Sequence, residues 1–152
     1  MSKETKVTYE YLKRMNVEQS DAVIKVDLNK IIRKMLTNYA DLLMADRFYN
    51  KYVLLCCLDM NGEFIYLCPN HSKVIGFAAE ELIGKKGYDM IHPDDVKRVN
   101  HFIVEVLSSK QPKEITYRIK HKQGGYVTVQ SVCMPYLVED RAAAIICFSN
   151  NL

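Results

Sequence analysis

Residues 74–95 read VIGFAAEELIGKKGYDMIHPDD, and this stretch decides the fold. It contains two brief apolar segments that end at Gly76 and Gly84, and glycine is the residue that most often ends a helix in the left-handed conformation. The spacing predicts short helices over residues 69–75 and 78–83. Helices of this length are not stable alone, so the rest of the chain must supply the core that holds them.

A longer helix is expected directly after this stretch. Pro93 suits a first helical turn, and Asp94 and Asp95 place negative charge at the positive end of the helix dipole. Apolar residues then recur on one side at helical spacing: Val96, Val99, Ile103 and Val106. The pattern predicts a helix that turns one face toward the core.

Segments with the composition of strands flank the helical region: residues 53–58, 63–67, 114–120, 126–136 and 142–148. The first and the last are continuous apolar runs, which are typical of central strands covered on both faces. Residues 114–120 alternate apolar and polar side chains, which indicates a position nearer an edge. We therefore expect an α+β fold. Its five-stranded antiparallel sheet has the first and last strands adjacent at the centre, with short helices and one longer helix over one face.

Residues 1–50 read as helical, although residues 22–26 are too short a stretch to classify, so we expect an N-terminal helical extension followed by a single domain over residues 53–150. Asp27 is suited to cap an amphipathic helix over residues 27–45. An apolar stripe runs along this helix, and its members are candidate interface residues: Leu28, Ile32, Met35, Tyr39 and Leu42. The stripe is compatible with packing on the chain's own domain and with packing against a partner.

In order and spacing, the segments of residues 53–150 resemble a PAS domain. The matching motifs are the hairpin at 53–67, VIGF at 74–77, EELIG at 80–84, IHPDD at 91–95, YRIK at 117–120 and GGYV at 124–127. Residues 117–131 resemble the second PAS domain of basic helix-loop-helix PAS transcription factors, and related fungal and other eukaryotic PAS regulators share them. The resemblance implies a PAS fold and a sensor or interaction module in signalling or transcription.

Two functions follow from this resemblance. The first is a non-catalytic module that forms a homodimer, or a heterodimer with another PAS-containing protein, through the outer sheet face and the helix before the first strand. The alternative is a sensor that holds a small molecule in its inner cavity and is coupled to an effector elsewhere. The sequence lacks Gly-x-Ser-x-Gly, a phosphate-binding glycine loop and His-Glu-x-x-His, so we expect no catalytic residues.

Composition restricts the location and the partners. The net charge of +3 comes with no basic tail, so direct nucleic-acid contact is not expected. The apolar runs are shorter than the ~20 residues that span a bilayer, so no membrane contact is expected. The five cysteines, with no apolar leader after Met1, predict free thiols in a reducing, intracellular compartment. This compartment is the nucleus if the chain belongs to a transcription factor, and otherwise the cytoplasm.

We expect neither a cofactor nor a metal. The light-oxygen-voltage subfamily of PAS domains attaches flavin to a cysteine in a stretch that corresponds here to residues 87–92, which contain none. His101 points away from the apolar stripe of its helix, so it is a surface residue rather than a haem ligand. Cys68 and His71 form a lone pair, whereas a structural zinc site needs four ligands.

Overall fold

The computed structural model describes residues 54–152 of the chain. The expected helix over residues 27–45 and its five interface candidates therefore lie outside the described residues. The strands are β1 (Leu54–Leu58), β2 (Phe64–Leu67), β3 (Lys113–Lys120), β4 (Tyr126–Val138) and β5 (Arg141–Asn151). Between β2 and β3 lie the helices α4 (His71–Ile75), α5 (Ala79–Leu82) and α6 (Pro93–Ser109), with the short 3-10 helix η2 (Gly87–Met90) before α6.

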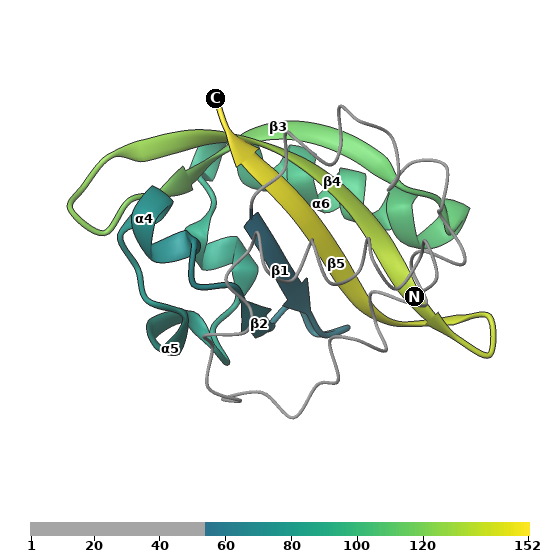
Figure 1. Cartoon of the computed structure of the whole chain (residues 1–152). Coiled ribbons are helices and arrows are strands. Elements are labelled where there is room, and N and C mark those ends of the chain that lie inside the picture. Colours follow the sequence, from purple (N-terminus) through teal and green to yellow (C-terminus); the bar gives the residue numbers. More distant parts are fainter. Residues whose placement is uncertain (1–53) are drawn as a thin grey trace, which may run out of the picture.

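The five strands form an antiparallel sheet in the order β2-β1-β5-β4-β3 (Figure 1). The first and last strands are therefore neighbours in the middle of the sheet, and the alternating strand β3 is at an edge. Both expectations from the sequence are confirmed. The physical reason is that β1 and β5 carry apolar residues on both faces, which only interior positions of a sheet can cover.

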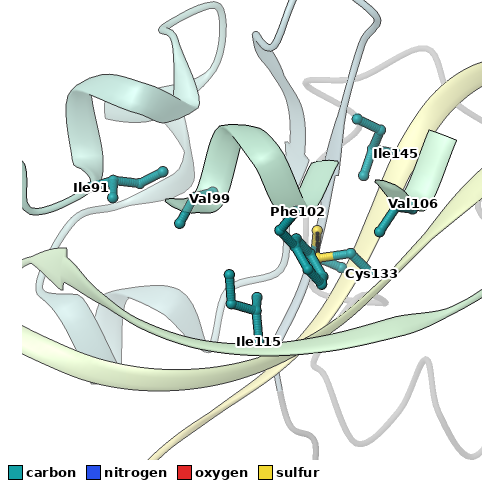
Figure 2. Packing of buried hydrophobic residues seen from close by; sticks show 8 residues of the cluster. Ile91, Val99, Phe102, Val106, Ile115, Cys133 and Ile145 are labelled. Atoms are coloured by element: carbon teal, nitrogen blue, oxygen red, sulfur yellow. Dashed lines mark hydrogen bonds between the residues drawn. The ribbon is translucent and has the colours of Figure 1, made fainter. Parts of the chain in front are cut away.

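The described helices lie on one side of the sheet (Figure 1), and we call this side of the sheet its inner face. Helix α6 packs over β3 and β4 and buries Val99, Phe102 and Val106. Figure 2 shows these side chains meeting Ile115 and Cys133 of the sheet. Phe102 was missing from the stripe predicted for this helix, whose remaining members Val96 and Ile103 are partly buried against the same cluster.

The glycine signals that decided the fold act as expected. Gly76 ends α4 with φ of 78°, and its amide donates to the Ser72 carbonyl. Gly84 follows α5 with φ of 83°. The sequence did not predict η2, which places Met90 in the buried cluster beneath α4 and α5. That segment has no helical periodicity of its own, so only the surrounding core determines its conformation.

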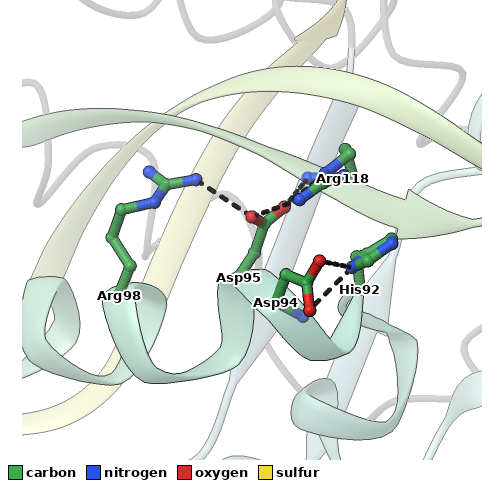
Figure 3. A network of polar contacts seen from close by, with 5 residues as sticks. All are labelled: His92, Asp94, Asp95, Arg98 and Arg118. Carbon is green, nitrogen blue, oxygen red and sulfur yellow. Dashed lines mark hydrogen bonds and ion pairs between the residues drawn. The ribbon is translucent and has the colours of Figure 1, made fainter.

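Asp95 joins the start of α6 to the exposed edge of the sheet (Figure 3). Its Oδ2 accepts hydrogen bonds from the Arg118 backbone amide at 3.0 Å and from Arg118 Nε at 2.9 Å. Its Oδ1 accepts from the second guanidinium nitrogen at 2.9 Å. The His92 amide donates to the Arg118 carbonyl at 2.9 Å, so backbone groups of edge strand β3 are occupied.

This arrangement corrects the sequence interpretation of the two aspartates. Asp94 and Asp95 were given the same role at the helix dipole. Asp94 is exposed, whereas Asp95 is buried and paired with Arg118. The hydrogen bonds from Arg118 hold the pKa of the Asp95 carboxyl well below its usual range.

Candidate functional site

A cavity of about 340 Å³ lies between the helices and the inner face of the sheet. Residues of two buried clusters line it, one under α6 and the other around α4, α5 and η2. A volume of roughly 300–1,000 Å³ is usual for a small-molecule site. The cavity is therefore the candidate functional site of the described chain.

Strand alternation determines which side chains reach the cavity. Along β1, the lining residues are Leu54, Cys56 and Leu58, and the residues between them point to the other face. Strand β5 contributes Ile145, Cys147 and Ser149 by the same rule. The helices complete the wall with apolar side chains, among them Ile75, Leu82, Met90 and Phe102.

The cavity opens between the β1–β2 turn, η2 and α6. Met60, Tyr88 and Val104 line it there and are 49%, 40% and 63% exposed. These three belong to the five large hydrophobic residues that the described part of the chain exposes. Apolar side chains kept in water around an opening suit the entry of an apolar molecule.

Three thiols form a row across the cavity wall. Cys147 of β5 lies opposite Cys56 of β1 on one side and opposite Cys133 of β4 on the other. The Sγ atoms of Cys133 and Cys147 are 2.7 Å apart. Hydrogen bonding between thiols and burial raise the pKa values of Cys56 and Cys147, so these thiols are neutral at physiological pH.

A chain of hydroxyl groups lies beside the thiols. Tyr117 Oη is 3.1 Å from Ser131 Oγ, which is 2.6 Å from Ser149 Oγ. Burial raises the pKa of the Tyr117 phenol, which is therefore also neutral. The wall is mainly apolar surface, thiols and hydroxyls, with Asp59 of the β1–β2 turn as its one carboxylate, so an uncharged molecule fits it best.

The sequence analysis considered Cys68 and His71 and expected no metal site there, because they form a lone pair. His71 is buried and lines the cavity, and its Nδ1 is 3.6 Å from Cys68 Sγ and 3.0 Å from the Cys68 carbonyl oxygen. Across residues 54–152, no three His, Cys, Asp or Glu side chains are grouped so that they could hold a metal ion. The pair remains a local contact, because two side chains are too few for a structural zinc site.

His101 lies on the outside of α6, as its helical phase predicted. Its side chain is 80% exposed, and its Nε2 is 3.2 Å from Glu105 Oε1. It does not line the cavity. Residues 87–92, where a flavin-binding cysteine would lie in the light-oxygen-voltage subfamily, form η2 and the two residues before α6, of which His92 is the N-cap.

The sequence analysis raised an inner cavity only through the family resemblance, and it missed the thiol row. It treated the five cysteines simply as free thiols. The sequence signal for the row was incomplete, because Cys56, Cys133 and Cys147 become neighbours only when the strand order β1-β5-β4 and its register are known.

In the described part of the chain, no helix has the length and apolar character needed to cross a bilayer.

Comparison with known proteins gives several similar regulators, three of which illustrate the identity and coverage. The Aspergillus flavus blue light receptor lreA is 30% identical over 94 residues, which cover 62% of this chain and 10% of that protein. The mouse basic helix-loop-helix ARNT-like protein 2 is 34% identical over 74 residues, or 47% of this chain and 13% of that protein. White collar 1 protein of Neurospora crassa is 32% identical over 74 residues, or 49% of this chain and 6% of that protein. The chain thus spans about a tenth of the length of these regulators.

Solved structures agree with the fold. The PAS-B domain of Drosophila melanogaster Cycle, solved with bound ethylene glycol, has a TM-score of 0.61 and 20% identity. The match covers 65% of this chain and 99% of that domain. A PAS domain from Colwellia psychrerythraea also has a TM-score of 0.61, at 17% identity, over 65% of this chain and 85% of that one.

A family model described as the PAS fold matches residues 64–148, more than half of the chain. The match includes the glycine-ended helices, α6, the strands β2, β3 and β4, and most of β5. The chain belongs to the PAS family.

Proposed function

We propose that this chain is a non-catalytic PAS module that associates with itself or with another PAS protein inside a signalling or transcriptional regulator. The association surface combines the outer face of the sheet with the apolar stripe of residues 27–45. The relatives support the general class, because they include a blue light receptor and basic helix-loop-helix proteins. A module of this kind would act in the nucleus as part of a transcription factor.

The observation that carries this proposal is the composition of the outer face of the sheet. Two apolar rows cross β1, β5 and β4 on the side away from the cavity: Leu55, Phe148 and Val132, then Cys57, Ile146 and Met134. Tyr66 of β2 extends the second row. The described helices all lie on the other side (Figure 1).

These seven side chains are each 5% exposed or less, so the outer face is not open to solvent. Burying one Leu, Ile, Met or Phe side chain contributes on the order of 1.5–3 kcal/mol, so the layer that covers the two rows contributes substantially to stability. The stripe Leu28, Ile32, Met35, Tyr39 and Leu42 has the matching character and precedes β1, a strand next to the middle of this face. We propose that the stripe packs against this face and that two modules associate through the layer that it forms.

The test replaces two stripe residues with charge. Ile32→Glu with Met35→Glu should give a folded protein with a monomer mass by light scattering, because two carboxylates oppose burial of the stripe. The matched control is Lys30→Glu with Thr37→Glu, which lie on the opposite side of the same expected helix. The control should keep the wild-type mass.

A different result would contradict the proposal that the stripe is an association surface. If the stripe only packs within its own chain, the Ile32→Glu and Met35→Glu variant should lose thermal stability while its mass stays equal to that of wild type. Circular dichroism before the light-scattering measurement establishes which variants are folded.

A ligand sensor is the second candidate function, and the cavity supports it. Its volume of about 340 Å³ is large enough for a small molecule, and its thiols and hydroxyls suit an uncharged one. Native mass spectrometry of the gently purified protein should then detect a bound mass that denaturation releases. A protein that carries no added mass and whose melting temperature small apolar compounds leave unchanged would contradict the sensor function.

A further inference from the structure

The thiol row contains a pair placed for covalent chemistry. Cys133 and Cys147 are directly opposed residues of antiparallel strands β4 and β5, both facing the cavity. Opposed residues in such strands have Cα atoms about 4.5–5.5 Å apart, within the range that a disulfide bridges. Their Sγ atoms are 2.7 Å apart, and a disulfide bond is about 2.05 Å long.

We propose that Cys133 and Cys147 are a reversible oxidation site, which forms a cross-strand disulfide when hydrogen peroxide enters the cavity. Both thiols are free in the structure. They are 2% and 4% exposed, so a large oxidant does not reach them from outside. The cavity gives a molecule as small as hydrogen peroxide a route through the opening beside Met60 and Val104.

The reaction balances with one peroxide for two thiols. One thiol loses its proton, and its sulfur attacks a peroxide oxygen. The O–O bond breaks, one water leaves, and a sulfenic acid remains. The second sulfur then attacks the sulfenic sulfur, the S–O bond breaks, and a second water forms from the departing hydroxide and the thiol proton. The protein loses two hydrogen atoms, and a dithiol reductant restores both thiols by exchange.

The surroundings set the speed of this reaction. The hydrogen bond with Cys133 raises the pKa of Cys147, so little of the reactive thiolate is present at neutral pH. The oxidation rate should therefore rise roughly tenfold for each pH unit between about 7 and 9. The titratable groups around the pair are Cys56 and Cys57 of β1, Tyr117 of β3 and, beyond Cys56, His71 of α4.

Intact mass spectrometry of the full chain treated with hydrogen peroxide tests the proposal. After denaturation with N-ethylmaleimide, the oxidised protein should carry three alkyl groups instead of the five expected from its free cysteines. Peptide mapping without reductant should join the peptides that contain Cys133 and Cys147. Dithiothreitol before alkylation should restore five groups.

Cysteine variants test whether Cys133 and Cys147 are the residues that form the disulfide. Cys147→Ser, with Cys147→Ala as a second choice if the serine does not fold, should keep all four remaining thiols alkylatable after peroxide. The control Cys57→Ser, on the other face of the sheet, should still lose two. A bridge that joins Cys56 to Cys147 in the wild type, a bridge between two chains, or no loss of alkylation would overturn the proposal.

Discussion

Two neighbouring aspartates at the start of α6 have opposite environments, and one of them carries much of the contact with β3. Asp95 is buried and accepts three hydrogen bonds from Arg118, whereas Asp94 is exposed. The sequence alone did not distinguish them, because both are acidic residues in a first helical turn. Their difference comes from the position of the helix start relative to the edge of β3, which is a property of the folded sheet.

We expect Asp95→Asn to lower the free energy of unfolding at pH 7 by about 2 kcal/mol, because it weakens charge-assisted hydrogen bonds. The pKa of Asp95 is lowered by folding, so its stabilisation is complete above the unfolded-state value of about 4 and is lost as the pH falls further. Denaturant unfolding at several pH values should show the two proteins converging in strong acid. Asp94→Asn is the matched control, and an equal loss in both variants would contradict the account.

Cys56 and Cys57 provide a second comparison between neighbours. Cys56 lines the cavity, and Cys57 is fully buried on the outer face. Cys56→Leu should fill part of the cavity, cost little stability and reduce any ligand mass seen by native mass spectrometry. Cys57→Leu should cost about 1–3 kcal/mol, because it adds volume to a packed position. Equal melting temperatures for the two variants would show that the cavity is not available space.

At the scale of elements, local sequence signals predicted most of the helices and strands. They predicted less about the surroundings of single residues. The glycines after α4 and α5, the proline that begins α6 and the apolar runs of β1 and β5 all describe conformations set by nearby residues. The strand order followed from which runs were apolar on both faces. By contrast, η2 and the thiol row depend on tertiary neighbours, so no short stretch of sequence could indicate them.

The two helix-ending glycines allow a test at this scale. Both have positive φ, so alanine at either position should cost about 1 kcal/mol or more. At Gly76 a new Cβ would also lie 3.1 Å from His121 and 3.2 Å from Lys122, whereas at Gly84 it would have open space. Gly76→Ala should therefore lower the melting temperature more than Gly84→Ala. The reverse order would contradict the close packing of α4 against the β3–β4 turn.

At the scale of the whole molecule, the sheet has two apolar faces with different uses. The inner face is covered by α4, α5 and α6 and encloses the cavity with its thiols and hydroxyls. The outer face carries two apolar rows across the three central strands, on the side away from the described helices (Figure 1), and their side chains are 5% exposed or less. We propose that the inner face serves a small ligand and thiol oxidation, and that the outer face serves association.

The most direct test of this account is the mass of the full chain in solution over a series of concentrations, measured by sedimentation equilibrium. The measurement is made on the chain alone and after mixing with a PAS domain of a basic helix-loop-helix ARNT-like protein. The account predicts a concentration-dependent rise to a dimer mass, either of the chain with itself or with the added domain. A monomer mass of 17.6 kDa at every concentration, with no complex in the mixture, would contradict it.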